Sequence, residues 1–302
     1  MRAAVAIALL LVAGPALGHD GQNHGGPAWT TSLWVTVPLA VSGGLYGLGV
    51  LRLWRRVGIG RGVRLWQASC FALGWLLLVG ALVSPLHWLG ERLFMAHMTE
   101  HEIIMALAAP LLAVARPIGG MIWAFPSRWR PAIGGLGQTR LWSGVQRLLT
   151  DPPVATLLHG IALWAWHAPV LYDAALRHPM VHWAQHLSFL VTALLFWWSL
   201  LQGRARQRGY GAAVFYLFVT ALHSGFLGIL LTVAREPIYP LQTTAAPAWG
   251  LTPLEDQQLA GLIMWVPAGL VYAVAALVLA GLWIRHSGLA AKREGGHALI
   301  TH

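Results

Sequence analysis

Apolar residues dominate seven runs of this 302-residue chain, and polar residues gather in the connections between them. A helix needs about 20 mostly apolar residues to cross the hydrocarbon core of a bilayer, and each run is close to that length. We therefore predict an all-α fold, a polytopic membrane protein that is a bundle of seven transmembrane helices. The runs cover residues 31–53, 65–86, 92–114, 152–171, 182–202, 210–233 and 259–284.

The composition supports the membrane assignment. Hydrophobic residues make up 57% of the chain and charged residues only 10%, whereas an average soluble protein is about 25% charged. The single cysteine, Cys70, lies inside an apolar run, so the chain has no intramolecular disulfide and no metal site built from paired cysteines.

The basic residues alternate between the connections, which predicts the orientation. Sixteen of the 20 Lys and Arg residues fall in connections on one side of the predicted membrane. Only Arg92, Arg177 and Arg235 fall on the other side. The positive-inside rule then places the N-terminus outside and the C-terminal tail, 285–302, in the cytoplasm. The net charge of +10 is thus explained by topology, and nucleic-acid binding is excluded as its cause.

The first 18 residues have the form of a signal peptide. Arg2 is followed by an apolar stretch and by Ala16-Leu17-Gly18, a small-residue cleavage site. We predict a signal peptide at 1–18, followed by a His/Gly-rich outer segment at 19–30. After cleavage, His19 would offer an α-amine and an imidazole, a chelate suited to Cu(II). The alternative is that this segment is incidental.

The 14 histidines are concentrated at the predicted outer ends of the helices. Two helices open with a histidine pair spaced four apart, so that both rings lie on one helical face. The shared pattern is HxxZH, with a polar residue at Z: His97, Glu100 and His101 in the third helix, and His182, Gln185 and His186 in the fifth.

Two more histidines approach the same level of the membrane. His167 is near the outer end of the fourth helix, and His223 is near the middle of the sixth. At 1.5 Å per residue, the deeper ones lie about 15 Å from the outer boundary. A charged residue at this depth costs roughly 2.5–3.5 kcal/mol on insertion scales. A single histidine such as His159 is explained by a hydrogen bond between helices. A whole group indicates a shared site in the outer leaflet.

The types of side chain in this layer favour copper. Imidazole binds copper among other metals, and thioether selects Cu(I). The main predicted ligands are His97, His101, His182 and His186, approached by His167 and His223, with Met98 and Met105 as Cu(I) ligands. We expect the side chains of Glu100 and Gln185 to orient the imidazoles by hydrogen bonds to the ring nitrogens that do not bind the metal. Asp256, at the outer mouth of the last helix, belongs either to a partner surface or to a solvated helix start.

Several short motifs, in this order, resemble a known family. The motifs are His97-Met98-x-Glu100-His101, Ala109-Pro110-Leu111-Leu112, Trp166-His167-x-Pro169-x-x-Tyr172, His182-x-x-Gln185-His186-x-x-Phe189, His223-Ser224 and Asp256-Gln257-Gln258-x-Ala260-Gly261. Over residues 31–284 the chain is similar to the seven-helix CtaG-type assembly factors of bacterial caa-type cytochrome c oxidases. Gln185 stands where this resemblance leads us to expect Glu more often.

The resemblance implies a function and a location. It implies a factor, not an enzyme, that is required to make active oxidase and acts in providing copper to it. The partners implied are cytochrome c oxidase subunits, periplasmic copper chaperones and the lipid bilayer. The location implied is the bacterial inner (plasma) membrane.

Three other functions are compatible with the histidines. Facing helices can supply two axial ligands to a haem. His97-x-x-Glu100-His101 has the HxxEH order of some metalloproteases, although Met105 breaks the HExxH order. Polar residues at membrane depth also mark metal or proton transporters. A polar layer confined to one leaflet favours receiving or handing over an ion rather than carrying it across.

Overall fold

The computed structural model describes residues 29–136, 139–202 and 210–298. Every regular element in these ranges is a helix, which agrees with the all-α prediction. The predicted signal peptide and most of the outer segment 19–30 lie outside the described residues.

Six helical segments are long and apolar enough to cross a membrane, and one bent pair would make a seventh. The six are α2 (Leu33–Val57), α3 (Leu65–Leu82), the continuous stretch Phe94–Ala115, α12 (Pro179–Leu201), α14 (Tyr210–Val233) and the Pro253–Arg285 part of α15. The structure thus has six to seven candidate spans, as expected for a multi-pass membrane protein. Its orientation in the membrane stays a prediction.

The Phe94–Ala115 span contains a π-helical turn. It consists of α5 (Phe94–Glu102), the π-helix η1 (Ile103–Ala108) and α6 (Ala109–Ala115). The N–H of Ala109 bonds to the carbonyl of Ile104, five residues earlier, and Pro110 has no N–H for the next carbonyl, that of Met105. The indole N–H of Trp197 on α12 donates to that carbonyl at 2.9 Å. A contact between two spans therefore satisfies the group that proline leaves unpaired.

The predicted helix 152–171 is broken in the structure. It divides into α10 (Pro152–Trp166) and α11 (Pro169–Arg177), which are bent by 73°. The break follows from Pro169, which lacks an N–H and disfavours helical dihedrals at the residue before it. His167 therefore lies at a corner of the chain instead of inside a continuous span.

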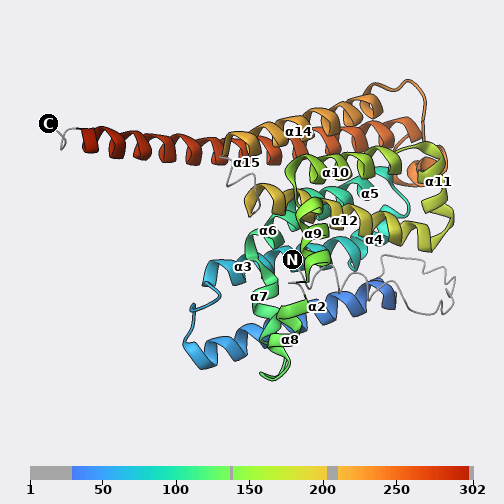
Figure 1. Cartoon of the computed structure of the whole chain (residues 1–302). Helices are drawn as coiled ribbons and strands as arrows, with labels where there is room; N and C mark the ends of the chain where they lie inside the picture. Colours follow the sequence, from blue (N-terminus) through green and yellow to red (C-terminus); the bar gives the residue numbers. More distant parts are fainter. Residues whose placement is uncertain (1–28, 137–138, 203–209, 299–302) are drawn as a thin grey trace.

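The last two long helices, α14 and α15 (Pro253–Ala298), form a close pair along one edge of the bundle (Figure 1). A side chain at Gly261 would bring its Cβ to 2.5 Å from the carbonyl oxygen of Gly228. The pair can approach this closely because both positions are glycine. α15 begins six residues before the predicted 259 and runs through much of the predicted tail, so its end extends beyond the other helices (Figure 1).

Shorter helices lie in the connections. α4 (Pro85–Gly90) joins α3 to α5, and the 3₁₀-helix η2 (Gln242–Trp249) lies between α14 and α15. The connection after α6 holds α7 (Pro117–Ile122), α8 (Arg130–Leu136) and α9 (Arg140–Leu149).

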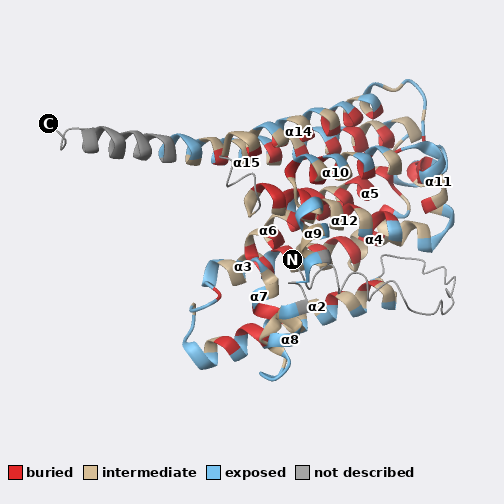
Figure 2. Cartoon of the chain, viewed as in Figure 1, coloured by how far each residue is buried: buried red, intermediate tan, exposed pale blue. Residues whose placement is uncertain are grey.

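The buried residues concentrate in the middle of the bundle, around Phe94–Ala115 and α12 (Figure 2). Phe94–Ala115 is the most buried of the six spans. A small hydrophobic cluster, separate from the main core, is formed by Leu93, Ala96 and Ala246. It joins the start of α5 to η2, with Leu86 and Leu89 of α4 packed against it. The helix that carries the first histidine pair is therefore held by α4 and η2 as well as by the main core.

Candidate metal centre

The start of α5 is fixed by a residue far away in the chain. Asp256 on α15 accepts hydrogen bonds from the backbone N–H groups of Phe94, at 2.8 Å, and Met95, at 3.0 Å. These N–H groups lie at the start of the helix and have no partner within it, and the carboxylate also suits the positive end of the helix dipole. Asp256 is fully buried, so the expectation of a solvated or partner-facing carboxylate is wrong. It positions α5, and with it His97.

The histidine pair on α5, His97 and His101, faces the pair on α12, His182 and His186. The ring centroids are 4.3 Å apart for His97 and His101, and 4.5 Å for His182 and His186. Between the helices, His97 lies 5.4 Å from His182, and His101 lies 5.1 Å from His186. The four main candidate ligands thus come together in one group.

Three of these side chains have the geometry of a metal site. One ring nitrogen from each of His97, His182 and His186 lies within 4.8 Å of the others. Small movements of the rings would bring these nitrogens to the 2.0–2.1 Å metal–nitrogen distance typical of zinc–imidazole sites. His101 packs beside them, with no hydrogen-bond partner at either ring nitrogen in the described chain. The donor set fits a metal ion that favours imidazole.

His167 joins the group from the corner between α10 and α11. Its ring centroid is 6.4 Å from that of His101. Its Nδ1 lies 2.7 Å from the carbonyl oxygen of Leu163, which can only accept, so Nδ1 carries the hydrogen. The neutral ring then has its lone pair on Nε2, which is buried and has no partner among the described residues. A histidine that donates one N–H to a carbonyl and offers the other nitrogen is the usual arrangement of a metal ligand.

His87 also belongs to the group, although the sequence did not single it out as a ligand. It lies on α4, and its ring stacks on that of His182 at 5.6 Å. Its Nδ1 lies 3.3 Å from a carboxylate oxygen of Glu100. Burial lowers the pKa of His87, but the hydrogen bond and negative charge of Glu100 outweigh burial, so this pKa lies above its usual value. The only sequence signal was its place in Ser84-Pro85-Leu86-His87, just before the first histidine motif.

Glu100 lies between two of these imidazoles. Besides His87, it approaches Nε2 of His186 at 3.9 Å. The backbone of Gly90 packs against the carboxylate, since a Cβ at that position would lie 2.7 Å from Oε1. The carbonyl of Gly90 in turn accepts a hydrogen bond from the Gln242 amide at 2.8 Å. The carboxylate is thus enclosed by α4, while α4 is attached to η2.

The remaining predicted site residues do not make the contacts with the histidine group that the sequence led us to expect. Gln185 is fully buried, but in the described chain neither atom of its side-chain amide has a hydrogen-bond partner, so the expected bond to an imidazole is not formed. Met98 and Met105 are buried in the main hydrophobic core. His223 lies against Gly160 on α10, and it is not among the ring contacts of the group around His97.

Most of the group is shielded from water, and His182 is its partly exposed member. His97 and His101 are each 1% exposed, and His87, His167 and His186 are each 4% exposed. Two aromatic side chains add to the enclosure. Measured between ring centroids, Phe189 lies 4.7 Å from His101, and Tyr172 lies 5.6 Å from His97. Buried imidazole nitrogens without partners are costly, so this arrangement is one that a bound cation would stabilise.

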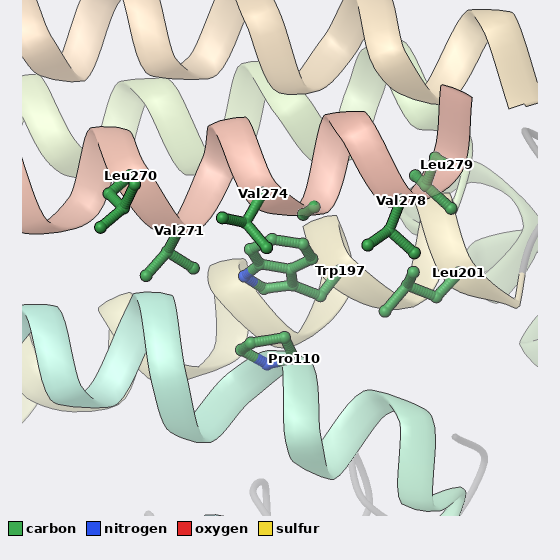
Figure 3. A pocket seen from close by; sticks show the side chains of 9 residues that line it. Pro110, Trp197, Leu201, Leu270, Val271, Val274, Val278 and Leu279 are labelled. Atoms are coloured by element: carbon green, nitrogen blue, oxygen red, sulfur yellow. The ribbon is translucent and has the colours of Figure 1, made fainter. Parts of the chain in front are cut away.

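An apolar groove elsewhere in the bundle is a separate feature. It runs along α15 between Leu270 and Leu279, beside Trp197 and Pro110 (Figure 3). Its lining holds no ionisable side chain, so it offers no ligand for a metal. The histidine group, and not this groove, is the candidate site.

The fold and the site together define a helical, multi-pass membrane protein with a buried imidazole cluster between its central helices. Residues 44–286 match the model of the cytochrome c oxidase caa3 assembly factor family (Caa3_CtaG), and the chain belongs to this family. The resemblance noted in the sequence is thereby confirmed over most of the chain. The same comparisons match the chain to no curated protein and to no solved structure.

Proposed function

We propose that this protein binds copper at the histidine cluster and delivers it to a haem–copper cytochrome c oxidase during assembly. The observation that carries the proposal is the approach of three imidazole nitrogens, from His97, His182 and His186, to within 4.8 Å of one another. Membership of an oxidase assembly family supplies the biological setting. In this role copper is cargo, and the protein is a binding and transfer factor rather than an enzyme.

The chemistry of the cluster supports copper as the ion. Imidazole suits copper, and the only cysteine of the chain, Cys70, lies on α3, a helix that contributes no histidine to the cluster. An imidazole site without thiolates can hold copper and still release it to a partner. His101 and His167 would serve as further ligands during transfer, with Met98 on α5 and Met105 on η1 as the proposed Cu(I) ligands. Glu100 would hold His87 and His186 in place.

The proposed topology puts this cluster where copper is available. With the N-terminus outside, α5 and α12 begin at the outer face of the bacterial plasma membrane, and their histidines lie in its outer leaflet. The segregation of arginines between connections supports this orientation. Periplasmic copper chaperones and oxidase subunits, the proposed partners, would then meet the cluster from the same side.

Copper titration of the purified full-length protein tests the proposal. The variant His97→Ala/His182→Ala/His186→Ala removes the three converging imidazoles, and His178→Ala removes an exposed histidine just before α12 as a control. We expect the triple variant to lose copper binding at the cluster and to fail to restore oxidase activity in cells that lack the native protein, while the control behaves as wild type. Equal copper stoichiometry and affinity in the triple variant would rule out the assigned site.

A further inference from the structure

Two cationic side chains converge on one indole ring near the end of α2. The guanidinium carbon of Arg130, the first residue of α8, lies 4.2 Å from the ring centroid of Trp123. The guanidinium carbon of Arg56, in the last turn of α2, lies 6.0 Å from the same centroid. The indole ring attracts each cation, but the two positive charges repel each other. A negatively charged group bound beside them would therefore stabilise the arrangement.

Close packing holds the segments that carry this pair together. α7, which ends just before Trp123, packs against α2 (Figure 1). The backbones touch at Gly49 on α2 and Gly120 on α7, since a Cβ at Gly49 would collide with the Gly120 carbonyl oxygen. Arg52 on α2 also donates a hydrogen bond to the carbonyl of Ala124. The ends of α2 and α7 are thus fixed relative to each other.

The backbone after α7 holds the guanidinium of Arg130. Its Nε donates to the carbonyl of Phe125 at 2.9 Å, and its Nη2 lies 3.4 Å from the carbonyl oxygen of Trp123. A guanidinium has five N–H donors arranged in a fork that matches phosphate oxygens, so donors remain for a ligand. This cation is therefore oriented before any ligand binds.

The chain supplies no counter-charge to this pair of arginines. Residues 21–90 and 103–150 contain ten arginines and no Asp or Glu. None of the ion pairs within the described residues involves Arg56 or Arg130. Their counter-charge therefore comes from the solution or from the membrane.

Exposed apolar side chains next to the pair favour the membrane as the source. Val57 and Ile59 closely follow Arg56, Trp129 directly precedes Arg130, and all three apolar side chains are exposed. Such a mixture of tryptophan, arginine and aliphatic side chains suits the headgroup level of a bilayer. A soluble anion would contact only the arginines, whereas a phospholipid would contact the arginines through its phosphate and the apolar side chains through its acyl chains.

We propose that Arg56, Trp123 and Arg130 form a binding site for the headgroup of an anionic phospholipid. The inference is independent of the copper proposal. The lipid phosphate accepts hydrogen bonds from both guanidiniums, and its acyl chains lie along the exposed apolar side chains of the same segments. Basic pockets between membrane spans recognise anionic headgroups in this way. The bound lipid holds the connection after α6 against the end of α2.

Native mass spectrometry of the purified full-length protein in detergent tests this site. The protein is titrated with phosphatidylglycerol and, separately, with phosphatidylcholine of the same acyl chains, which has no net charge. We expect tighter binding of phosphatidylglycerol. Each arginine near a membrane surface contributes about 1 kcal/mol, so Arg56→Gln should weaken that binding about fivefold and leave phosphatidylcholine binding unchanged.

Two further variants separate a defined site from a diffuse positive charge. Trp123→Leu keeps every arginine but removes the ring that positions two of them, so it should also lose the preference for phosphatidylglycerol. Arg147→Gln removes an exposed arginine on α9 that makes no cation–π contact with Trp123 in the described chain, and it should bind as wild type. Equal weakening in Arg147→Gln and Arg56→Gln would overturn the site.

Two other results would also contradict the proposal. If wild type binds the two lipids equally, the headgroup charge is not recognised. If inorganic phosphate at the same concentration displaces phosphatidylglycerol, the site binds free phosphate and not a lipid. Gel filtration checks the fold of each variant, and if Trp123→Leu does not fold, the comparison of Arg56→Gln with Arg147→Gln decides.

Discussion

The carboxylate of Asp256 caps α5 by accepting a hydrogen bond from the backbone N–H of Phe94, a residue 162 positions earlier in the chain. This bond ties the start of the last span to the start of the span that carries His97 and His101. A side chain of α15 therefore supplies the cap that orients α5. The placement of the candidate metal centre thus depends on the docking of α15 against α5.

Replacing Asp256 with alanine should weaken both the fold and the site. Two buried N–H groups, those of Phe94 and Met95, would lose their acceptor. Each unsatisfied buried group costs about 1–3 kcal/mol, so we expect a clear drop in unfolding temperature together with weaker copper binding. Thermal unfolding and copper titration of the same preparation measure both effects. Glu91→Gln, which alters an exposed carboxylate nearby, is the control and should change neither.

A methyl group at Gly90 should disturb the candidate metal centre without removing any of its proposed ligands. In Gly90→Ala, the Cβ would lie 2.7 Å from Oε1 of Glu100, so the carboxylate must move away from His87 and His186. Loss of an orienting partner typically reduces metal affinity about 10–100-fold. We expect a reduction of this order in copper affinity. Gly80→Ala, which meets no atom within 4 Å, should bind as wild type, and equal affinity in both variants would contradict an orienting role for Glu100.

The contact between His87 and Glu100 should make stability depend on pH in the copper-free protein. The pKa of His87 in the folded protein is raised, because Glu100 outweighs the effect of burial. A raised pKa means that the folded state holds the proton more tightly than the unfolded state. The resulting stability is fully present below the ordinary histidine pKa of about 6.5 and is lost as pH rises through the raised value.

Thermal unfolding of wild type and His87→Phe, measured from mild acid to alkaline pH, tests the direction of this pH dependence. The difference in unfolding temperature between the two proteins should be largest in mild acid and should shrink as the pH becomes alkaline. His178→Ala, which changes an exposed histidine, should follow wild type at every pH. If the difference in unfolding temperature stays constant or grows with pH, the contact with Glu100 does not raise the pKa of His87.

The π-helical turn should depend on Trp197. Its indole N–H is the donor for the Met105 carbonyl that Pro110 leaves unpaired. Trp197→Phe keeps an aromatic ring in place to stack on Tyr272 but removes the donor, and we expect a loss of about 1–3 kcal/mol in the free energy of unfolding. Denaturant unfolding in detergent measures it. Trp66→Phe, at an exposed position on α3, is the matched control and should leave stability unchanged.

The apolar runs of the sequence were sufficient to predict most of the helices. The prediction failed where a proline breaks a helix or where a contact with a distant residue decides the structure. The runs at 31–53, 182–202 and 210–233 correspond closely to α2, α12 and α14, because an apolar stretch of spanning length has few other stable conformations in a bilayer. The run at 152–171 is predicted as one helix, whereas Pro169 divides it. His167 ends α10 just before the bend and lies 6.4 Å from His101 between ring centroids, so it joins His87, His97, His101, His182 and His186 as the sixth histidine of the cluster.

The sequence by itself determined the class of protein, the approximate spans and the two HxxZH motifs, because helical periodicity and hydrophobic length are local properties. The tertiary structure alone decided which histidines meet. It brought His87 into the cluster, placed His223 against Gly160 and away from the cluster, and made Asp256 a buried cap. These outcomes depend on how helices distant in sequence pack and rotate against one another, and the spacing of residues within a single helix carries no information about that packing.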